Sequence, residues 1–165
     1  MNYNNFALYG FAILFIIYLY YLSLNLKENN YIIFGSILVT IGYLFAVLEL
    51  YNNNKYKNKI AKSHLILGAF LLLSLILPIN KHSKNTDIFG LIGHLILIHG
   101  DFGYTKLANI CMTIYYVLYT YRNGIKNNII EKVQGVGGGL VLLYYIKKMI
   151  DDWYTNKEKK LENKK

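Results

Sequence analysis

The chain has 165 residues, of which 55% are hydrophobic and 16% charged, and its formal net charge is +9. A typical soluble domain carries about 25% charged residues, so this composition argues against an ordinary water-soluble domain. The positive residues lie between long apolar runs and near the C-terminus instead of forming one polar face, and we therefore expect no nucleic-acid partner.

Two long apolar runs open the chain. Residues 6–26 contain no charged residue over 21 positions, and residues 31–48 contain none over 18. A helix needs about 20 apolar residues to cross the ~30 Å hydrocarbon core of a bilayer. We therefore predict membrane spans at 6–26 and 31–51, and the short polar turn between them predicts antiparallel neighbours.

The middle of the chain holds three further segments. Residues 60–79 form a third predicted span, with Pro78 close to its end, where a proline can stop a helix. The mostly apolar stretch 88–121 would be about 51 Å long as one helix, too long for one crossing. Its Gly-Asp-Phe-Gly sequence at 100–103 indicates a turn. We therefore predict a short or re-entrant segment at 88–100 and a span at 104–121.

The last apolar segment, residues 133–150, is rich in glycine and short of a full crossing unless the lysines at its end extend towards the interface. A charged tail follows at 151–165. The fold class predicted from these segments is all-α: a single domain, residues 1–150, built as a multi-pass transmembrane helical bundle of five to six membrane segments.

The distribution of lysine and arginine predicts the orientation. With six spans and a cytoplasmic N-terminus, 12 of these residues lie inside and 6 outside. With five spans the inside excess is smaller. Cytoplasmic loops carry the excess of positive residues in membrane proteins, so we expect six spans with both termini and the tail in the cytoplasm.

Ionisable residues within a membrane segment are costly and mark candidate sites. The candidates here for a ligand site or proton pathway are His94, His99, Asp101 and Glu49. His94 lies within an apolar segment, where it either serves as a ligand or proton-relay group or makes an interhelical hydrogen bond. His99 lies about 140° from His94 around a helix, which disfavours one metal ion shared by both. Glu49 is expected to pair with a lysine such as Lys55 or Lys62.

Small residues in apolar helices mark close contacts between helices. Gly135 and Gly139 form a G-x-x-x-G pattern, and Gly35, Gly42 and Gly93 are further candidates for helix packing. The tyrosines, 17 in all, mark no site by their spacing. The sequence contains no Ser-His-Asp arrangement, CxxC, HExxH or phosphate-binding loop.

Three classes of function remain open. The first is a non-enzymatic structural or accessory component of a membrane or membrane complex, with the lipid bilayer and a membrane-protein partner or a second copy of the chain around it. The second is a small ion or solute transporter or channel that uses Glu49, His94 or Asp101. The third is a haem- or metal-dependent membrane enzyme that uses His64, His94 and His99. Scarce intramembrane charge favours the first class, and no cofactor or metal is expected.

Overall fold

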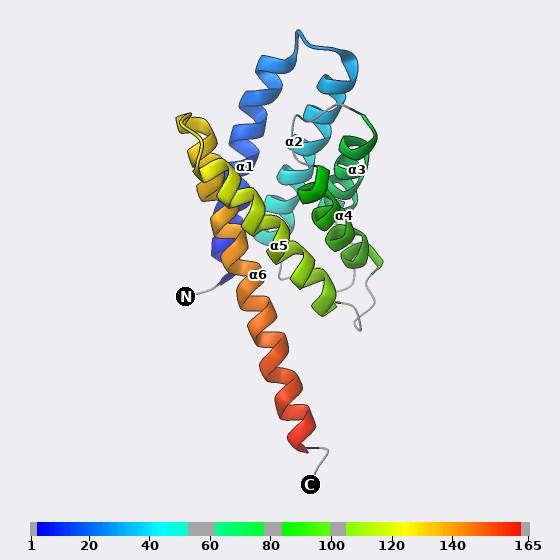
Figure 1. Cartoon of the computed structure of the whole chain (residues 1–165), viewed down its shortest axis with the longest axis vertical. Helices are drawn as coiled ribbons and strands as arrows, with labels where there is room; N and C mark the ends of the chain where they lie inside the picture. Colours follow the sequence, from blue (N-terminus) through cyan, green and yellow to red (C-terminus); the bar gives the residue numbers. More distant parts are fainter. Residues whose placement is uncertain (1–2, 53–61, 78–83, 100–104, 163–165) are drawn as a thin grey trace.

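The computed structural model describes residues 3–52, 62–77, 84–99 and 105–162, and within these ranges it is an all-α bundle of six helices (Figure 1). One helix overlaps each of the six segments predicted from the sequence. The helices are α1 (Tyr3–Asn25), α2 (Asn30–Tyr51), α3 (Lys62–Ile76), α4 (Lys84–His99), α5 (Thr105–Gly124) and α6 (Ile129–Glu162).

Three of these helices are long and apolar enough to cross a membrane: α1, α2 and α6 over its part Ile129–Asp151. Two others, α3 and α4, are apolar but shorter, with 15 and 16 residues. The sequence predicted a full span at 60–79 and a short one at 133–150. In the described residues α3 has only 15 residues, whereas α6 is long enough to cross a membrane. α6 has 34 residues because Asn128 caps its start and no glycine or proline ends it before the charged tail.

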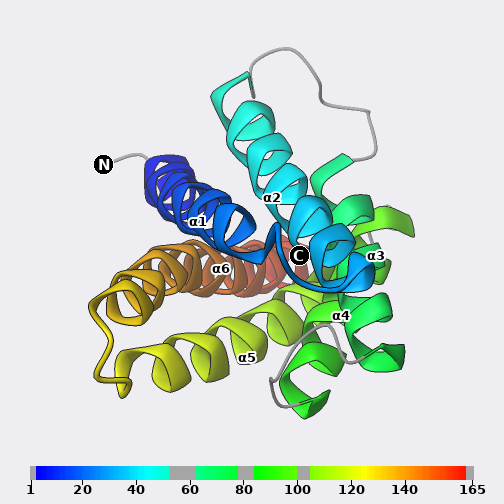
Figure 2. The ribbon, with the colours of Figure 1, turned by 90° about the horizontal axis from the view of Figure 1, so that it is seen from above.

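The six helices form a closed ring. Each helix packs against the next one in the chain, and α6 packs against α1 (Figure 2). Within the described ranges no other pair of helices brings its backbones this close, although side chains of α1 and α5 meet across the ring, as where the hydroxyls of Tyr18 and Tyr119 lie 3.3 Å apart. The first and last helices are therefore neighbours, although more than a hundred residues separate them in sequence.

Neighbouring helices run in opposite directions. On α1 and α6, for example, Gly10 lies against Gly137, while Tyr18, two turns further along, contacts Gln134. With six alternating helices, α1 begins at the same end of the bundle at which α6 leaves it (Figure 1). We call this the tail end, where α2 and α4 also end and α3 and α5 begin. The opposite end, with the connections 26–29 and 125–128, is the hairpin end.

Glycines allow α6 to fit between α1 and α5. A methyl group added at Gly10 would lie 2.7 Å from the carbonyl oxygen of Gly137 and 2.7 Å from Val141. On the other face of α6, a methyl group at Gly138 would lie 2.7 Å from Tyr119. Only glycine permits backbones to approach this closely.

The glycines named from the sequence lie in different surroundings. A methyl group added to Gly42 would lie 2.6 Å from Leu67, and one added to Gly93 would lie 2.6 Å from Met112. A methyl group added to Gly135 would lie 3.0 Å from the backbone of Gly124. One added to Gly139 would lie at an ordinary 3.6 Å from Thr120. Gly35 is buried in α2. Within the last helix, Gly137 and Gly138 therefore make the tight contacts that the G-x-x-x-G spacing assigned to Gly139.

The bundle buries polar side chains within its core and exposes apolar ones. Large apolar side chains are exposed on all six helices, among them Ile16, Phe34, Leu72, Leu95, Val117 and Leu143. The buried polar side chains are Ser36, Thr40, Ser63, Ser74, Thr86, Asp87, His94, Asn109, Asn123 and Gln134. A water-soluble bundle places most of its polar residues outside, so this distribution suits an apolar solvent.

The α1–α6 contact yields a first prediction. Gly10→Ala should lower the free energy of unfolding by about 1–3 kcal/mol, because the new methyl group meets backbone atoms that cannot move away. Gly139→Ala is the matched control, since its methyl group finds ordinary space, and it should be near neutral. Denaturant titration of both variants in the same detergent measures the difference. Equal stabilities would show that α1 and α6 do not approach as closely as described.

Candidate functional site

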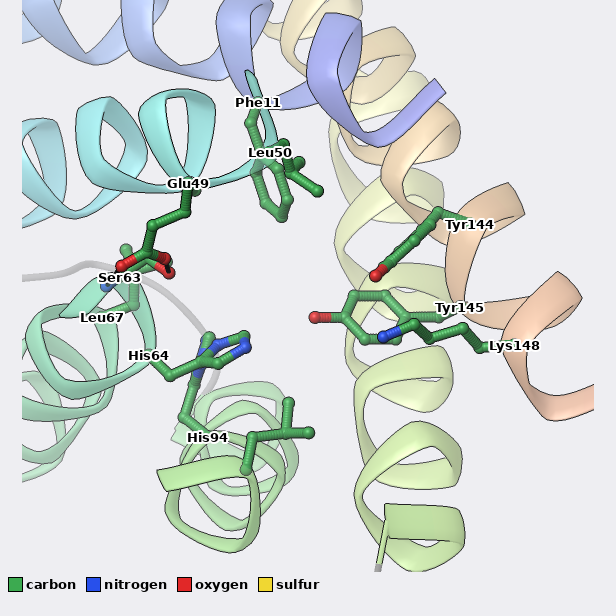
Figure 3. A pocket seen from close by; sticks show the side chains of 12 residues that line it. Phe11, Glu49, Leu50, Ser63, His64, Leu67, His94, Tyr144, Tyr145 and Lys148 are labelled. Atoms are coloured by element: carbon green, nitrogen blue, oxygen red, sulfur yellow. Dashed lines mark hydrogen bonds between the residues drawn. The ribbon is translucent and has the colours of Figure 1, made fainter. Parts of the chain in front are cut away.

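A cavity of about 200 Å³ lies near the tail end, inside the ring of helices. Its polar side chains come from three places far apart in sequence (Figure 3). The polar residues that line it are Glu49 of α2, Ser63 and His64 of α3, His94 of α4, and Tyr144, Tyr145 and Lys148 of α6. The cavity therefore gathers two residues that the sequence named as separate candidates, Glu49 and His94.

The two histidines contact each other directly. The Nδ1 atoms of His64 and His94 are 3.0 Å apart, and His94 is almost fully buried. Gly68 lies beside His94, where an added methyl group would meet the His94 Cβ at 3.4 Å, so α3 and α4 approach closely here. One ring must donate its Nδ1 proton and the other must accept it, which leaves one Nε2 atom as an acceptor and the other as a donor when both rings are neutral.

Glu49 is engaged by the first turn of α3. Its carboxylate accepts one hydrogen bond from the backbone N–H of Ser63, at 3.2 Å, and another from the Ser63 hydroxyl. A carboxylate at the start of a helix is stabilised by the partial positive charge of the unpaired N–H groups there. The sequence predicted a lysine partner for Glu49, but Lys62 lies over the ring of Phe45 instead, and Lys55 lies outside the described residues.

The α6 side of the cavity carries one cation and two phenols. The Nζ atom of Lys148 lies 4.9 Å from the centre of the Tyr144 ring, a distance at which a cation is attracted to an aromatic face. The neighbouring Lys147 points elsewhere and pairs with Asp151. Tyr145 is buried and stacks on Tyr116 of α5, with ring centres 5.7 Å apart.

Two of the sequence candidates have side chains outside the described part of the structure. His99 is the last residue of α4, and its side chain lies outside the described part of the structure. Asp101 lies outside it altogether. The sequence missed Lys148, which suggested an interfacial anchor, and Ser63, which has no signal beyond its place at a helix start.

A second polar cluster, which the sequence also missed, lies towards the hairpin end. Asp87 accepts a hydrogen bond from the Ser74 hydroxyl at 3.0 Å, and Gln134 donates to the hydroxyls of Tyr18 and Tyr119. Asp87 stands at the border of an apolar run, which is the one signal that could have drawn attention to it. Tightly packed side chains, including the fully buried Leu14 and Tyr116, lie in the core of the ring.

No group of three or more His, Cys, Asp or Glu side chains within the described residues could hold a metal ion. The Nδ1 atoms of His64 and His94 contact each other, so neither Nδ1 is free for another ligand. The arrangement is that of a small polar pocket between helices.

The contact between Glu49 and Ser63 gives the second prediction. Glu49→Ala should lower the free energy of unfolding by roughly 1–3 kcal/mol, because two donors at the start of α3 lose their acceptor. The control is Glu28→Ala, at an exposed position in the connection between α1 and α2, which should change it by less than about 0.5 kcal/mol. Denaturant unfolding in detergent compares the two. A similar effect from both would mean that Glu49 does not hold α3.

Comparisons with known proteins leave the site without a precedent. No family model, no curated protein and no solved structure matches this chain. Any function must therefore be argued from the residues of the cavity and from the arrangement of the helices around it.

Proposed function

We propose that the protein is an integral membrane protein in which all six helices cross the bilayer, and that it binds and moves a small solute or ion through the interior of its ring. Exposed apolar side chains on every helix support the first part, because lipid contacts the whole circumference of such a ring. Six crossings also agree with the distribution of positive residues, which favours cytoplasmic termini.

The short helices fit this proposal if the bilayer adapts to them. α3 and α4 are about 22 Å and 24 Å long at 1.5 Å per residue, less than the ~30 Å of an average hydrocarbon core. A bilayer thins around short spans at a modest cost per ångström. The polar side chains at both ends of this helix pair, His64 with His94 and Ser74 with Asp87, would then lie near the two interfaces.

The observation that carries the proposal is the cavity itself. It joins the buried His94 with His64, Glu49 and the exposed Lys148, from four helices of a bundle whose exterior is apolar. Ionisable groups are retained at such places where they serve a substrate or ion. Towards the hairpin end the ring is filled by packed side chains and by the cluster around Gln134, as expected of a carrier closed on one side.

A second candidate is an accessory component of a membrane complex. α6 continues beyond the other helices at the tail end (Figure 1), and its Trp153 is 66% exposed. An apolar groove of about 360 Å³ lies beside it, lined by Ile110, Met149 and Ile150 among others. This surface suits a membrane-protein partner or a second copy of the chain.

The proposed topology makes the third prediction. A cysteine placed at Glu28 should react with a membrane-impermeant thiol reagent from the side opposite to the cytoplasm, because six crossings with a cytoplasmic N-terminus put the first connection outside. Cys111, which is buried in α5, should be replaced first, and a cysteine in the tail serves as the opposite-side control. Labelling of position 28 from the cytoplasmic side would exclude the six-crossing topology.

The fourth prediction tests transport. Liposomes containing the purified chain should take up at least one of sodium, potassium, chloride, acetate or phosphate faster than empty liposomes, and His94→Ala or Glu49→Gln should reduce that uptake several-fold. Glu28→Gln is the control that leaves the rate unchanged.

Equal uptake by the wild type, the variants and empty liposomes would exclude a transporter. Recovery of a membrane-protein partner or a stable oligomer in mild detergent would then favour the accessory role.

A further inference from the structure

Several polar atoms that line the cavity can donate hydrogen bonds, although one Nε2 atom of the histidine pair is an acceptor when both rings are neutral. Lys148 brings an ammonium group with three donors, and its recorded contact within the described residues is the ring of Tyr144, which accepts no full hydrogen bond. Figure 3 shows the hydroxyls of Tyr144 and Tyr145 pointing from α6 towards the histidines. The histidine pair presents at least one further N–H, because its Nδ1 contact uses one proton of two.

The one carboxylate that lines the cavity does not offset these donors. Each oxygen of Glu49 already accepts one hydrogen bond from Ser63, and Figure 3 shows the carboxylate and Lys148 on opposite sides of the cavity. A cation placed here would find few free oxygen ligands, whereas hard cations in proteins are held by six or more. An anion would find a charged donor and several neutral ones.

The adjacent residues Lys147 and Lys148 differ in their partners, so Lys147 can serve as a control for Lys148. Lys147 is paired with Asp151, whereas Lys148 lines the cavity and has no carboxylate partner within the described residues. Lys148 lines the cavity but is itself an exposed residue, so solvent screens its charge more than that of a buried cation, and the neighbouring hydroxyls must contribute to holding an anion.

We propose that the cavity is a binding site for a small anion, such as a carboxylate or phosphate group, held by the Lys148 ammonium together with the hydroxyls of Tyr144 and Tyr145. A volume of about 200 Å³ is below the ~300–1,000 Å³ of pockets for drug-sized ligands and suits an ion of few atoms. This proposal rests on the proposed transport function, because it gives the class of solute that the protein would carry. Binding itself is measured without flux.

The test is the thermal unfolding of the full chain in a neutral detergent free of lipid. Sodium acetate and sodium phosphate should raise the midpoint in a saturable way, and sodium gluconate at equal ionic strength, whose anion is larger, should not. Lys148→Gln should weaken the apparent affinity by at least about tenfold, because a hydrogen bond from a charged donor contributes an order of magnitude or more. Lys147→Gln should leave it unchanged, and Lys148→Arg should keep most of it.

A second arm separates a free anion from a lipid headgroup. Anionic phosphatidylglycerol is added to the micelles in place of the salts, with zwitterionic phosphatidylcholine as its control. A response to acetate or phosphate that Lys148→Gln abolishes supports the proposal. A Lys148-dependent response to the anionic lipid alone would overturn it in favour of a headgroup site, and so would equal responses of Lys147→Gln and Lys148→Gln, which would indicate general screening. Anion binding without uptake into liposomes would leave the site standing and remove the transport function.

Discussion

The close approach of α1 and α6 is the constraint on which the rest of the structure depends. At Gly10 and Gly137 the two backbones are so near that no side chain fits between them. This contact converts a row of six helices, each touching the next, into a ring. Without it, α6 would have one neighbour, and Tyr144, Tyr145 and Lys148 would face outward instead of facing the histidines across a cavity.

The ring also explains how polar side chains are accommodated in so apolar a chain. A polar group shielded from water must find a partner within the protein or remain unpaired at a cost of several kcal/mol, and the same holds for one that faces lipid. Most of the buried polar groups are paired across a helix boundary, such as Ser74 with Asp87 and Gln134 with Tyr119. These bonds stabilise the helix pairs, and the cavity is the place where donors remain for something else.

The helices could be predicted from the sequence, because a run of apolar residues without charge or proline has one favourable structure in a membrane. The ring could not, since every predicted span has apolar residues on all sides and no stripe indicates its neighbours. The length of α6 was missed because hydropathy falls at Asp151 while the backbone hydrogen bonding of the helix continues.

The site was predicted in part. A lone histidine in an apolar segment identified His94, but its partner His64 lies 30 residues away and meets it only when α3 and α4 fold back on each other. Glu49 was identified by its charge, and Ser63 was not foreseen as its partner, because the start of a helix attracts a carboxylate as a lysine does. The tyrosines showed no pattern along the chain, yet Tyr116 and Tyr145 stack in the core, since contacts between helices do not follow sequence spacing.

The order in which the helices pack has a consequence for the synthesis of the chain. Among the described residues of α1 to α5, backbones pack closely only between sequence neighbours, so each hairpin can form as soon as its second helix leaves the ribosome, at a small entropic cost of closing its loop. Only α6 packs its backbone against both α1 and α5, and it also supplies one wall of the cavity. The growing polypeptide therefore carries no finished pocket until this last helix closes the ring.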